Sequence, residues 1–205
     1  MPSVYDLKPK FQSLLRPLSD ALVAAGVTAN AVTIFAMLLS VASGVAIYRF
    51  HSFRILLILP MVLFLRMALN AIDGMIAREH NQKTALGAIL NELGDVFADA
   101  ALYLPLAFVP FFSPFLIIGV VLLAILSEMT GVVGVQIGAS RRYDGPMGKS
   151  DRAFIFGTLG LLLGLNLPIG PVVFPALVVM LILLCITIFN RARGALRELQ
   201  ARGTS

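Results

Sequence analysis

The sequence predicts an all-α, polytopic membrane protein with about six transmembrane helices and an N-terminal interfacial helix. Of its 205 residues, 59% are hydrophobic and 13% are charged, against about 25% charged residues in a soluble domain. The mean hydropathy is +0.92. Apolar runs long enough to cross a bilayer as helices recur between short polar connections. Several such spans leave no room for a sizeable second domain, so we expect one membrane domain over residues 1–205.

Residues 1–28 are expected to form an interfacial N-terminal segment. Within residues 8–22, apolar side chains recur at helical spacing between polar ones, which is typical of a helix lying in the membrane interface. A leader helix packed on the rest of the chain explains the pattern equally well. Pro17 is expected to break or restart this helix, because proline lacks a backbone N–H. No signal-peptide pattern is present, so we expect no cleavage.

The transmembrane core is expected over residues 29–192, followed by a basic tail at residues 193–205. Each long apolar run counts as one span, except the uncharged run at the C-terminal end, which is too long for one helix and contains helix-breaking residues near its middle. The expected spans cover residues 29–48, 55–78, 84–109 and 115–138, and two further spans share residues 153–190, divided near Asn166, Pro168, Gly170 and Pro171.

The distribution of cationic residues predicts the orientation. All but three of the 16 Lys and Arg residues fall on one side of the membrane, the exceptions being Arg49, Arg54 and the intramembrane Arg66. Because cationic loops stay in the cytoplasm, we expect both termini, the turn at residues 80–83 and the loop at residues 140–152 to be cytoplasmic, in a bacterial inner membrane. No basic stripe with interleaved aromatics accompanies the net charge of +5, so we expect membrane lipids and no nucleic acid as partners.

Five of the eleven acidic residues lie between Asn70 and Asp99. Carboxylates at membrane depth are costly and therefore indicate a functional site. Helical spacing places the polar residues of this segment on one stripe of each of two successive helices. Such oxygen-rich stripes suit Mg²⁺, which binds carboxylate and amide oxygens and leaves room for phosphate. The alternative is a polar core in which the carboxylates merely pair with Arg66 and Arg78. The stripes contain Asn70, Asp73, Gly74 and Ala77 on the first helix, and Gly87, Asn91, Asp95 and Asp99 on the second.

This spacing resembles the motif D-x2-D-G-x2-A-R-x8-G-x3-D-x3-D of the CDP-alcohol phosphotransferase (CDP-alcohol phosphatidyltransferase) family. The segment VTANAVT at residues 27–33 also resembles the family's T-P-N-x-x-T entry to the first span. Asn70 and Asn91 stand where the family has aspartate, so the chain resembles a divergent member whose site lacks two negative charges. The matching positions are Asn70, Asp73, Gly74, Ala77, Arg78, Gly87, Asn91 and Asp95.

The resemblance implies a metal-dependent enzyme of phospholipid biosynthesis. Such an enzyme transfers a phosphatidyl group from CDP-diacylglycerol, or a similar CDP-lipid, to an alcohol acceptor and releases CMP. Carried over by position, Asp73 and Asp95 hold Mg²⁺ or Mn²⁺, and Asp95 is the general base on the acceptor hydroxyl. The resemblance also implies a homodimer. It places Gly74, Ala77, Arg78 and Gly87 along the nucleotide and diphosphate.

Two asparagines weaken the electrostatic attraction of this site for a cation. Asn70 and Asn91 still offer carbonyl oxygens as metal ligands. Asp99 lies one turn beyond Asp95 on the same stripe, and we hypothesise that it restores one charge as a ligand or behind the ligands. The alternative function is a catalytically impaired relative that binds CDP-lipid or nucleotide without turnover. A small transporter is a weaker alternative, because the acidic residues gather near one face of the membrane.

Four cations in the long polar loop suit a phosphorylated acceptor, and glycerol 3-phosphate is the acceptor that we expect. They also fit a simple topology signal attracted to anionic lipids, and the sequence does not separate these interpretations. A further pair of intramembrane ions, Arg66 and Glu128, is expected to pair with each other. The loop cations are Arg141, Arg142, Lys149 and Arg152.

Overall fold

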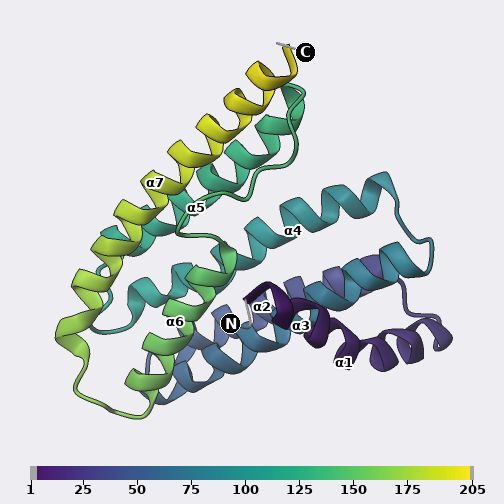
Figure 1. The fold of residues 1–205 in the computed structure, drawn as a ribbon. Coiled ribbons are helices and arrows are strands. Elements are labelled where there is room, and N and C mark those ends of the chain that lie inside the picture. The colour runs from purple at the N-terminus through teal and green to yellow at the C-terminus, as the bar shows by residue number, and fades with distance from the viewer. Residues whose placement is uncertain (1–3, 204–205) are drawn as a thin grey trace. The chain divides into compact units, whose positions relative to one another are not determined.

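The computed structural model describes residues 4–203 and confirms the all-α, polytopic membrane fold (Figure 1). The predicted N-terminal segment begins, and the predicted basic tail ends, outside these residues, at 1–3 and 204–205. Two short 3-10 helices, η1 (Phe53–Leu57) and η2 (Leu104–Phe108), accompany the α-helices. The α-helices are α1 (Val4–Ala24), α2 (Ala29–Phe50), α3 (Ile58–Glu79), α4 (Ala85–Tyr103), α5 (Pro114–Gln136), α6 (Lys149–Gly164) and α7 (Gly170–Gly203).

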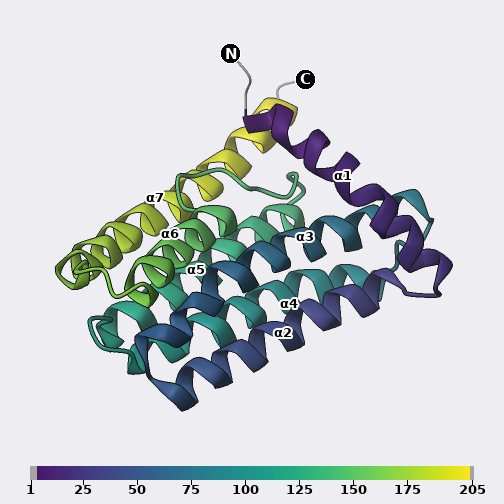
Figure 2. The same cartoon turned by 90° about the horizontal axis from the view of Figure 1, so that it is seen from below.

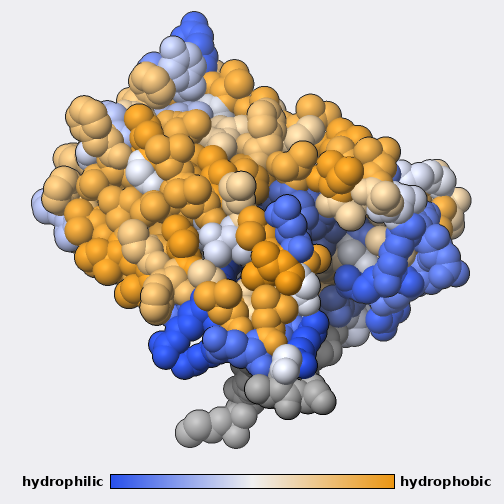
Figure 3. All heavy atoms as spheres, turned by 90° about the horizontal axis from the view of Figure 1, so that it is seen from above, coloured by the Kyte–Doolittle hydropathy of each residue, from blue (hydrophilic) through white to orange (hydrophobic). Residues whose placement is uncertain are grey.

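Helices α2 to α7 occupy the positions of the six expected spans. Four elements of the described chain are long and apolar enough to cross a membrane: Ala29–Phe50, Phe53–Glu79, Pro114–Gln136 and Gly170–Gly203. Of the other two helices, α4 carries several carboxylates and α6 has only 16 residues. Apolar side chains cover much of the face seen in Figure 3, as lipid contact requires.

The chain forms two compact units, which we describe separately. Unit 1 contains Met1–Ala42 and Met61–Asp99, and unit 2 contains Ser43–Pro60 and Ala100–Ser205. The expected single domain over residues 1–205 stays a prediction.

In unit 1, α2, α3 and α4 lie side by side (Figures 1 and 2). A buried apolar cluster joins α2 to α3, and three residues of α1 pack against it, so burial of one apolar face holds α1 on the unit. Leu14 and Leu18 of α1 stay exposed, at 76% and 51%. The cluster contains Ala29, Val32, Ile72 and Ile76, with Leu15, Leu22 and Val23 from α1.

Helix α1 runs without a break through Pro17, so the expected interruption is wrong. Proline removes one backbone hydrogen bond from a helix, but α1 has tertiary contacts on both sides of this position. Arg16 forms an ion pair with Glu79 at 3.0 Å, and the carboxylate of Asp20 lies 3.0 Å from the ring of His80. Together with the apolar packing, these contacts fix the helix to the end of α3.

In unit 2, α5 and α7 run side by side, and α6 packs against η1 and α7 (Figure 1). The loop between α5 and α6 is tied to this pair. The backbone N–H of Met147 donates to Thr187 Oγ1 at 2.9 Å. Gly145, at φ +121°, approaches Thr187 so closely that an added Cβ would lie 2.7 Å from its Cα atom. The positive φ and the lack of space both require glycine there.

Candidate active site

The last turns of α3 carry the first half of the motif. Asn70 is half-buried and Asp73 is 5% exposed. Thr33, on α2, donates a hydrogen bond from Oγ1 to Oδ2 of Asp73 at 2.8 Å. The buried carboxylate of Asp73 is therefore held by a neighbouring helix, as a buried polar group must be.

The second half of the motif lies on α4, where burial increases along the stripe. Asn91 is exposed, Asp95 is half-buried and Asp99 is buried. Nδ2 of Asn70 donates to Oδ1 of Asp95 at 3.2 Å, and this bond joins the stripe of α3 to that of α4. An ionised carboxylate only accepts hydrogen bonds, so the amide nitrogen of Asn70 is the atom that can face it.

Two glycines of the motif leave space that neighbouring polar atoms line. A Cβ atom on Gly74 would lie 3.0 Å from Nη1 of Arg78, and one on Gly87 would lie 2.8 Å from Oδ1 of Asn30. The guanidinium of Arg78 thus lies over the glycine face of α3, and the amide of Asn30 lies against α4. Ala77 is half-buried on the same part of α3. The glycines allow polar groups to approach the helix backbone.

Asp99 forms an ion pair within unit 1. Its Oδ1 atom lies 2.9 Å from Nη2 of Arg66, without the geometry of a directed hydrogen bond, and both side chains are buried. The expected pairing of Arg66 with Glu128 is wrong: Arg66 pairs with Asp99, and Glu128 pairs with arginines of unit 2. A buried cation needs a paired anion, and α4 supplies one to Arg66.

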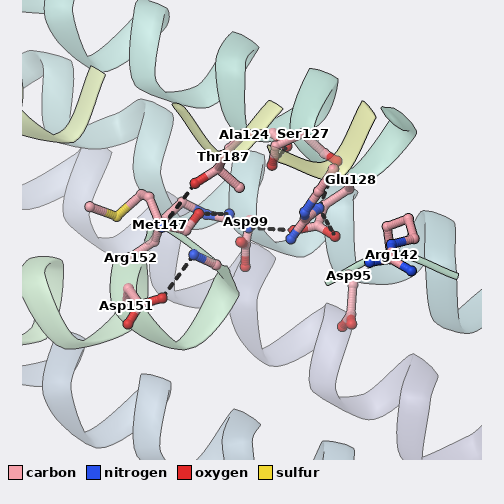
Figure 4. A network of polar contacts seen from close by, with 12 residues as sticks. Asp95, Asp99, Ala124, Ser127, Glu128, Arg142, Met147, Asp151, Arg152 and Thr187 are labelled. Atoms are coloured by element: carbon pink, nitrogen blue, oxygen red, sulfur yellow. Dashed lines mark hydrogen bonds and ion pairs between the residues drawn. The ribbon is translucent and has the colours of Figure 1, made fainter. Parts of the chain in front are cut away.

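Three arginines of unit 2 converge on the carboxylate of Glu128. Figure 4 shows Glu128 and Arg152 from close by. Oε2 of Glu128 lies 3.0 Å from Arg191 and 3.1 Å from Arg141, and Oε1 lies 3.4 Å from Arg152. The cluster draws on α5, the following loop, α6 and α7. Arg191 also donates to the carbonyl of Ser127 at 2.6 Å. Two of the predicted acceptor cations, Arg141 and Arg152, are therefore bound to an internal carboxylate.

Arg142 is also paired within unit 2. It donates to Asp144 at 2.7 and 2.8 Å and to Glu198 at 3.0 Å. The Arg142 guanidinium holds the pKa of the Asp144 carboxyl below its usual range, because its hydrogen bonds stabilise the ionised form. Asp144 raises the pKa of Arg142 in turn. The fourth predicted cation, Lys149, is half-buried at the start of α6.

A divalent metal fits the donor chemistry of the motif. In the part of the chain that the structure describes, no group of three or more His, Cys, Asp or Glu side chains is placed to hold a metal ion. The motif instead supplies the carboxylates of Asp73 and Asp95 with the amides of Asn70 and Asn91. Mg²⁺ commonly takes one or two carboxylates and completes its shell with water and phosphate oxygens. The residues fit that mode, with less negative charge than four carboxylates would give.

Thr33, Gln82 and Arg191 have no role predicted from the sequence. Thr33 contacts Asp73, Gln82 contacts the first residue of α2, and Arg191 pairs with Glu128. Gln82 accepts a hydrogen bond from the backbone N–H of Ala29 at 3.0 Å and so ties the turn after α3 to the start of α2. Thr33 lies within the VTANAVT segment, so the resemblance of this segment to the family motif could have indicated a role for Thr33. Nothing in the spacing pointed to Gln82 or Arg191.

Comparison with known protein families identifies the family of this chain. The model of the CDP-alcohol phosphatidyltransferase family matches residues 26–195. The chain therefore belongs to the CDP-alcohol phosphatidyltransferase family.

The chain is also similar in sequence to two individual proteins. The inner membrane protein YnbA of Escherichia coli (strain K12) is 51% identical over 159 residues, which cover 78% of this chain and 79% of YnbA. An uncharacterized protein of Aquifex aeolicus (strain VF5) is 38% identical over 95 residues, 46% of each chain.

Solved structures share the fold. Phosphatidylinositol phosphate synthase (PgsA1) of Mycobacterium tuberculosis, in complex with manganese and citrate, matches with a TM-score of 0.74 and 19% identity over 87% of each chain. The same protein with CDP-DAG bound matches with a TM-score of 0.68 and 21% identity, over 89% of this chain and 91% of PgsA1.

Proposed function

We propose that this protein transfers a phosphatidyl group from CDP-diacylglycerol to an alcohol acceptor in a metal-dependent reaction and releases CMP. The observation that carries the proposal is the bond between Asn70 and Asp95 at 3.2 Å, because it brings the two halves of the family motif together within one compact unit. Family membership and the CDP-DAG bound in the structurally similar PgsA1 support the choice of donor lipid.

The proposed reaction is a substitution at phosphorus. The acceptor oxygen forms a bond to the lipid-side phosphorus of the donor, the bond to the bridging oxygen breaks, and CMP leaves with that oxygen. Asp95 takes the proton of the acceptor hydroxyl as general base. The amide of Asn70 donates to Oδ1 of Asp95 and so holds the orientation of this carboxylate.

Asp73 and Asp95 are the proposed carboxylate ligands of Mg²⁺ or Mn²⁺, and Asn70 and Asn91 add amide oxygens. When bound, the metal neutralises negative charge on the diphosphate oxygens. Asp99, the proposed further ligand on the same helix, would have to exchange its contact with Arg66 for a contact with the metal. The proposed nucleotide and diphosphate face is lined by Gly74, Ala77, Arg78 and Gly87. Arg78 is exposed, and a guanidinium can bind phosphate oxygens through two parallel hydrogen bonds.

Glycerol 3-phosphate is the proposed acceptor, with Arg141, Arg142, Lys149 and Arg152 as its proposed phosphate partners. Three of these cations already contact carboxylates of unit 2, so a phosphate would have to exchange with those contacts. The charge distribution supports a cytoplasmic site in a bacterial inner membrane. The homodimer remains a proposal that rests on the family resemblance.

An acceptor panel tests the proposal. Purified protein with CDP-diacylglycerol and Mg²⁺ or Mn²⁺ is given glycerol 3-phosphate, inositol phosphate, inositol, serine or glycerol, and CMP release is measured. We expect release with one acceptor, its loss with EDTA and its loss in Asp95→Asn. Matched controls are Glu92→Gln, which removes an acid of the same helix that lies outside the motif, and the empty-vector membrane extract.

A second candidate function is binding of CDP-lipid without turnover. Two observations favour it: asparagines stand at positions 70 and 91, and the amide of Asn70 is engaged with Asp95. CDP-diacylglycerol binding that persists in Asp95→Asn, with no CMP released by the wild-type protein from any acceptor, would establish this function in place of the first.

A further inference from the structure

Thr33 on α2 faces two hydrogen-bond acceptors. Its Oγ1 atom lies 3.1 Å from the carbonyl oxygen of Ala29 and 2.8 Å from Oδ2 of Asp73. A hydroxyl has one proton and therefore donates to one acceptor at a time. A carboxylate is the stronger acceptor, because its charge strengthens the bond, and it is also the nearer one. The proton of Thr33 consequently belongs to Asp73.

The position of Thr33 is itself fixed. The backbone N–H of Ala29, at the first residue of α2, donates to Oε1 of Gln82 at 3.0 Å, which ties the start of α2 to the turn after α3. The neighbouring Asn30 lies against Gly87 of α4. The first turn of α2 therefore contacts the turn after α3 and the start of α4, and these contacts help to fix the position of Thr33.

Asp73 has a degree of freedom that this hydroxyl restricts. The torsion between Cβ and Cγ of aspartate is broad and roughly two-fold, so a carboxylate can rotate without leaving its preferred side-chain conformation. A hydrogen bond to Oδ2 fixes that rotation. Groups that hold metal ligands in this way commonly change metal affinity or activity by about 10- to 100-fold when they are removed.

We propose that Thr33 is a positioning residue for Asp73, orienting this carboxylate for a divalent cation. The inference rests on the proposed function, in which Asp73 is a metal ligand. Thr33 acts through Asp73 and contacts neither the lipid nor the reacting atoms in this role.

A purely structural role of Thr33 has a matched control elsewhere in the chain. Threonine in membrane helices often bonds to the carbonyl four residues earlier, as Thr33 can to Ala29. Thr130 of α5 has the same kind of bond, from Oγ1 to the carbonyl of Leu126 at 2.7 Å. Thr130→Val removes such a local bond, and Thr33→Val removes the contact to Asp73, so the pair separates the loss of any helix threonine hydroxyl from the loss of the contact to Asp73. Thr33→Ser keeps the donor.

The test is Mn²⁺ binding to the full-length protein in detergent, measured from the free-Mn²⁺ signal in electron paramagnetic resonance. Thr33→Val is expected to raise the Kd for Mn²⁺ by about 10- to 100-fold, while Thr33→Ser and Thr130→Val stay close to wild type. In the CMP-release assay, Thr33→Val should need more Mg²⁺ for half-maximal rate and recover most of its rate at saturating Mg²⁺. Size exclusion and thermal melting establish that each variant is folded.

Equal Mn²⁺ affinity of folded Thr33→Val and wild type would overturn the inference and leave the proposed function standing. Should Thr33→Val not fold, Thr33→Ala compared with Thr33→Ser carries the same test, and equal affinities for this pair would also overturn it. If the wild-type protein binds no Mn²⁺ at all, the metal-dependent function fails, and the role of Thr33 fails with it.

Discussion

Neutralising Glu128 tests whether the charges of unit 2 are paired as the structure describes them. The carboxylate of Glu128 forms ion pairs with Arg191, Arg141 and Arg152, at 3.0, 3.1 and 3.4 Å. The side chains of Arg152 and Arg191 are each 2% exposed, and that of Glu128 is 15% exposed. Glu128→Gln keeps the shape of the side chain and removes the charge, so the guanidinium groups lose this shared counterion.

The expected magnitude follows from burial. Removing one partner of a buried ion pair costs about 3–5 kcal/mol, because the other charge stays buried without compensation. The lower end applies here, since Glu128 is partly exposed and Arg191 also donates to the carbonyl of Ser127. A loss of about 3 kcal/mol lowers the melting temperature of a chain of this size by roughly 6–12 °C.

Thermal melting followed by far-UV circular dichroism in detergent measures this shift. Glu79→Gln is the control, because Glu79 pairs with Arg16 where both side chains are well exposed, at 38% and 50%, and exposed pairs contribute little. A melting temperature of Glu128→Gln equal to that of Glu79→Gln would refute the described charge cluster.

Two further predictions concern the motif and the loop. Asn70→Asp replaces the hydrogen-bond donor to Asp95 with a second negative charge, so the metal-free variant should melt at a lower temperature than wild type. Saturating Mn²⁺ should then raise the melting temperature of the variant by more than it raises that of wild type. Equal shifts in both proteins would contradict this prediction. Asp144 has a lowered pKa beside Arg142, so its stabilising contribution is complete above the unfolded-state pKa of aspartate and disappears as the pH falls through the folded-state value. The difference in melting temperature between wild type and Asp144→Asn should therefore be constant near neutral pH and close in acid, and a difference that persists in strong acid would contradict the pairing.

The fold was predictable because its signals are local. Apolar runs of membrane-spanning length gave the helix positions, and the spacing of polar residues gave the stripes of α3 and α4. The prediction of an interruption at Pro17 was wrong for a physical reason. A proline costs a helix one hydrogen bond, but α1 also packs on Ile72 and Ile76 and forms an ion pair through Arg16. These contacts involve residues far along the chain, which the local sequence around Pro17 does not reveal.

The partners of charged groups were not predictable to the same degree. Arg66 and Glu128 are both intramembrane ions, and the sequence offered no reason to prefer other partners for either. The choice depends on which helices pack together and at what rotation, which spacing within one helix does not encode. The contact between Thr33 and Asp73 joins residues 40 positions apart, and it arises in the same way from the packing of α2 on α3.

³¹P nuclear magnetic resonance follows the proposed transfer of a phosphatidyl group at the site formed by α3 and α4. Purified protein is incubated with CDP-diacylglycerol, Mg²⁺ and the acceptor panel, and the diphosphate signals of the lipid are followed. We expect these signals to disappear while CMP and a new phosphodiester appear in equal amounts, and we expect Asp73→Asn and Asp95→Asn to abolish the change. If the diphosphate signals persist with every acceptor in a folded wild-type protein, the proposed transfer is wrong.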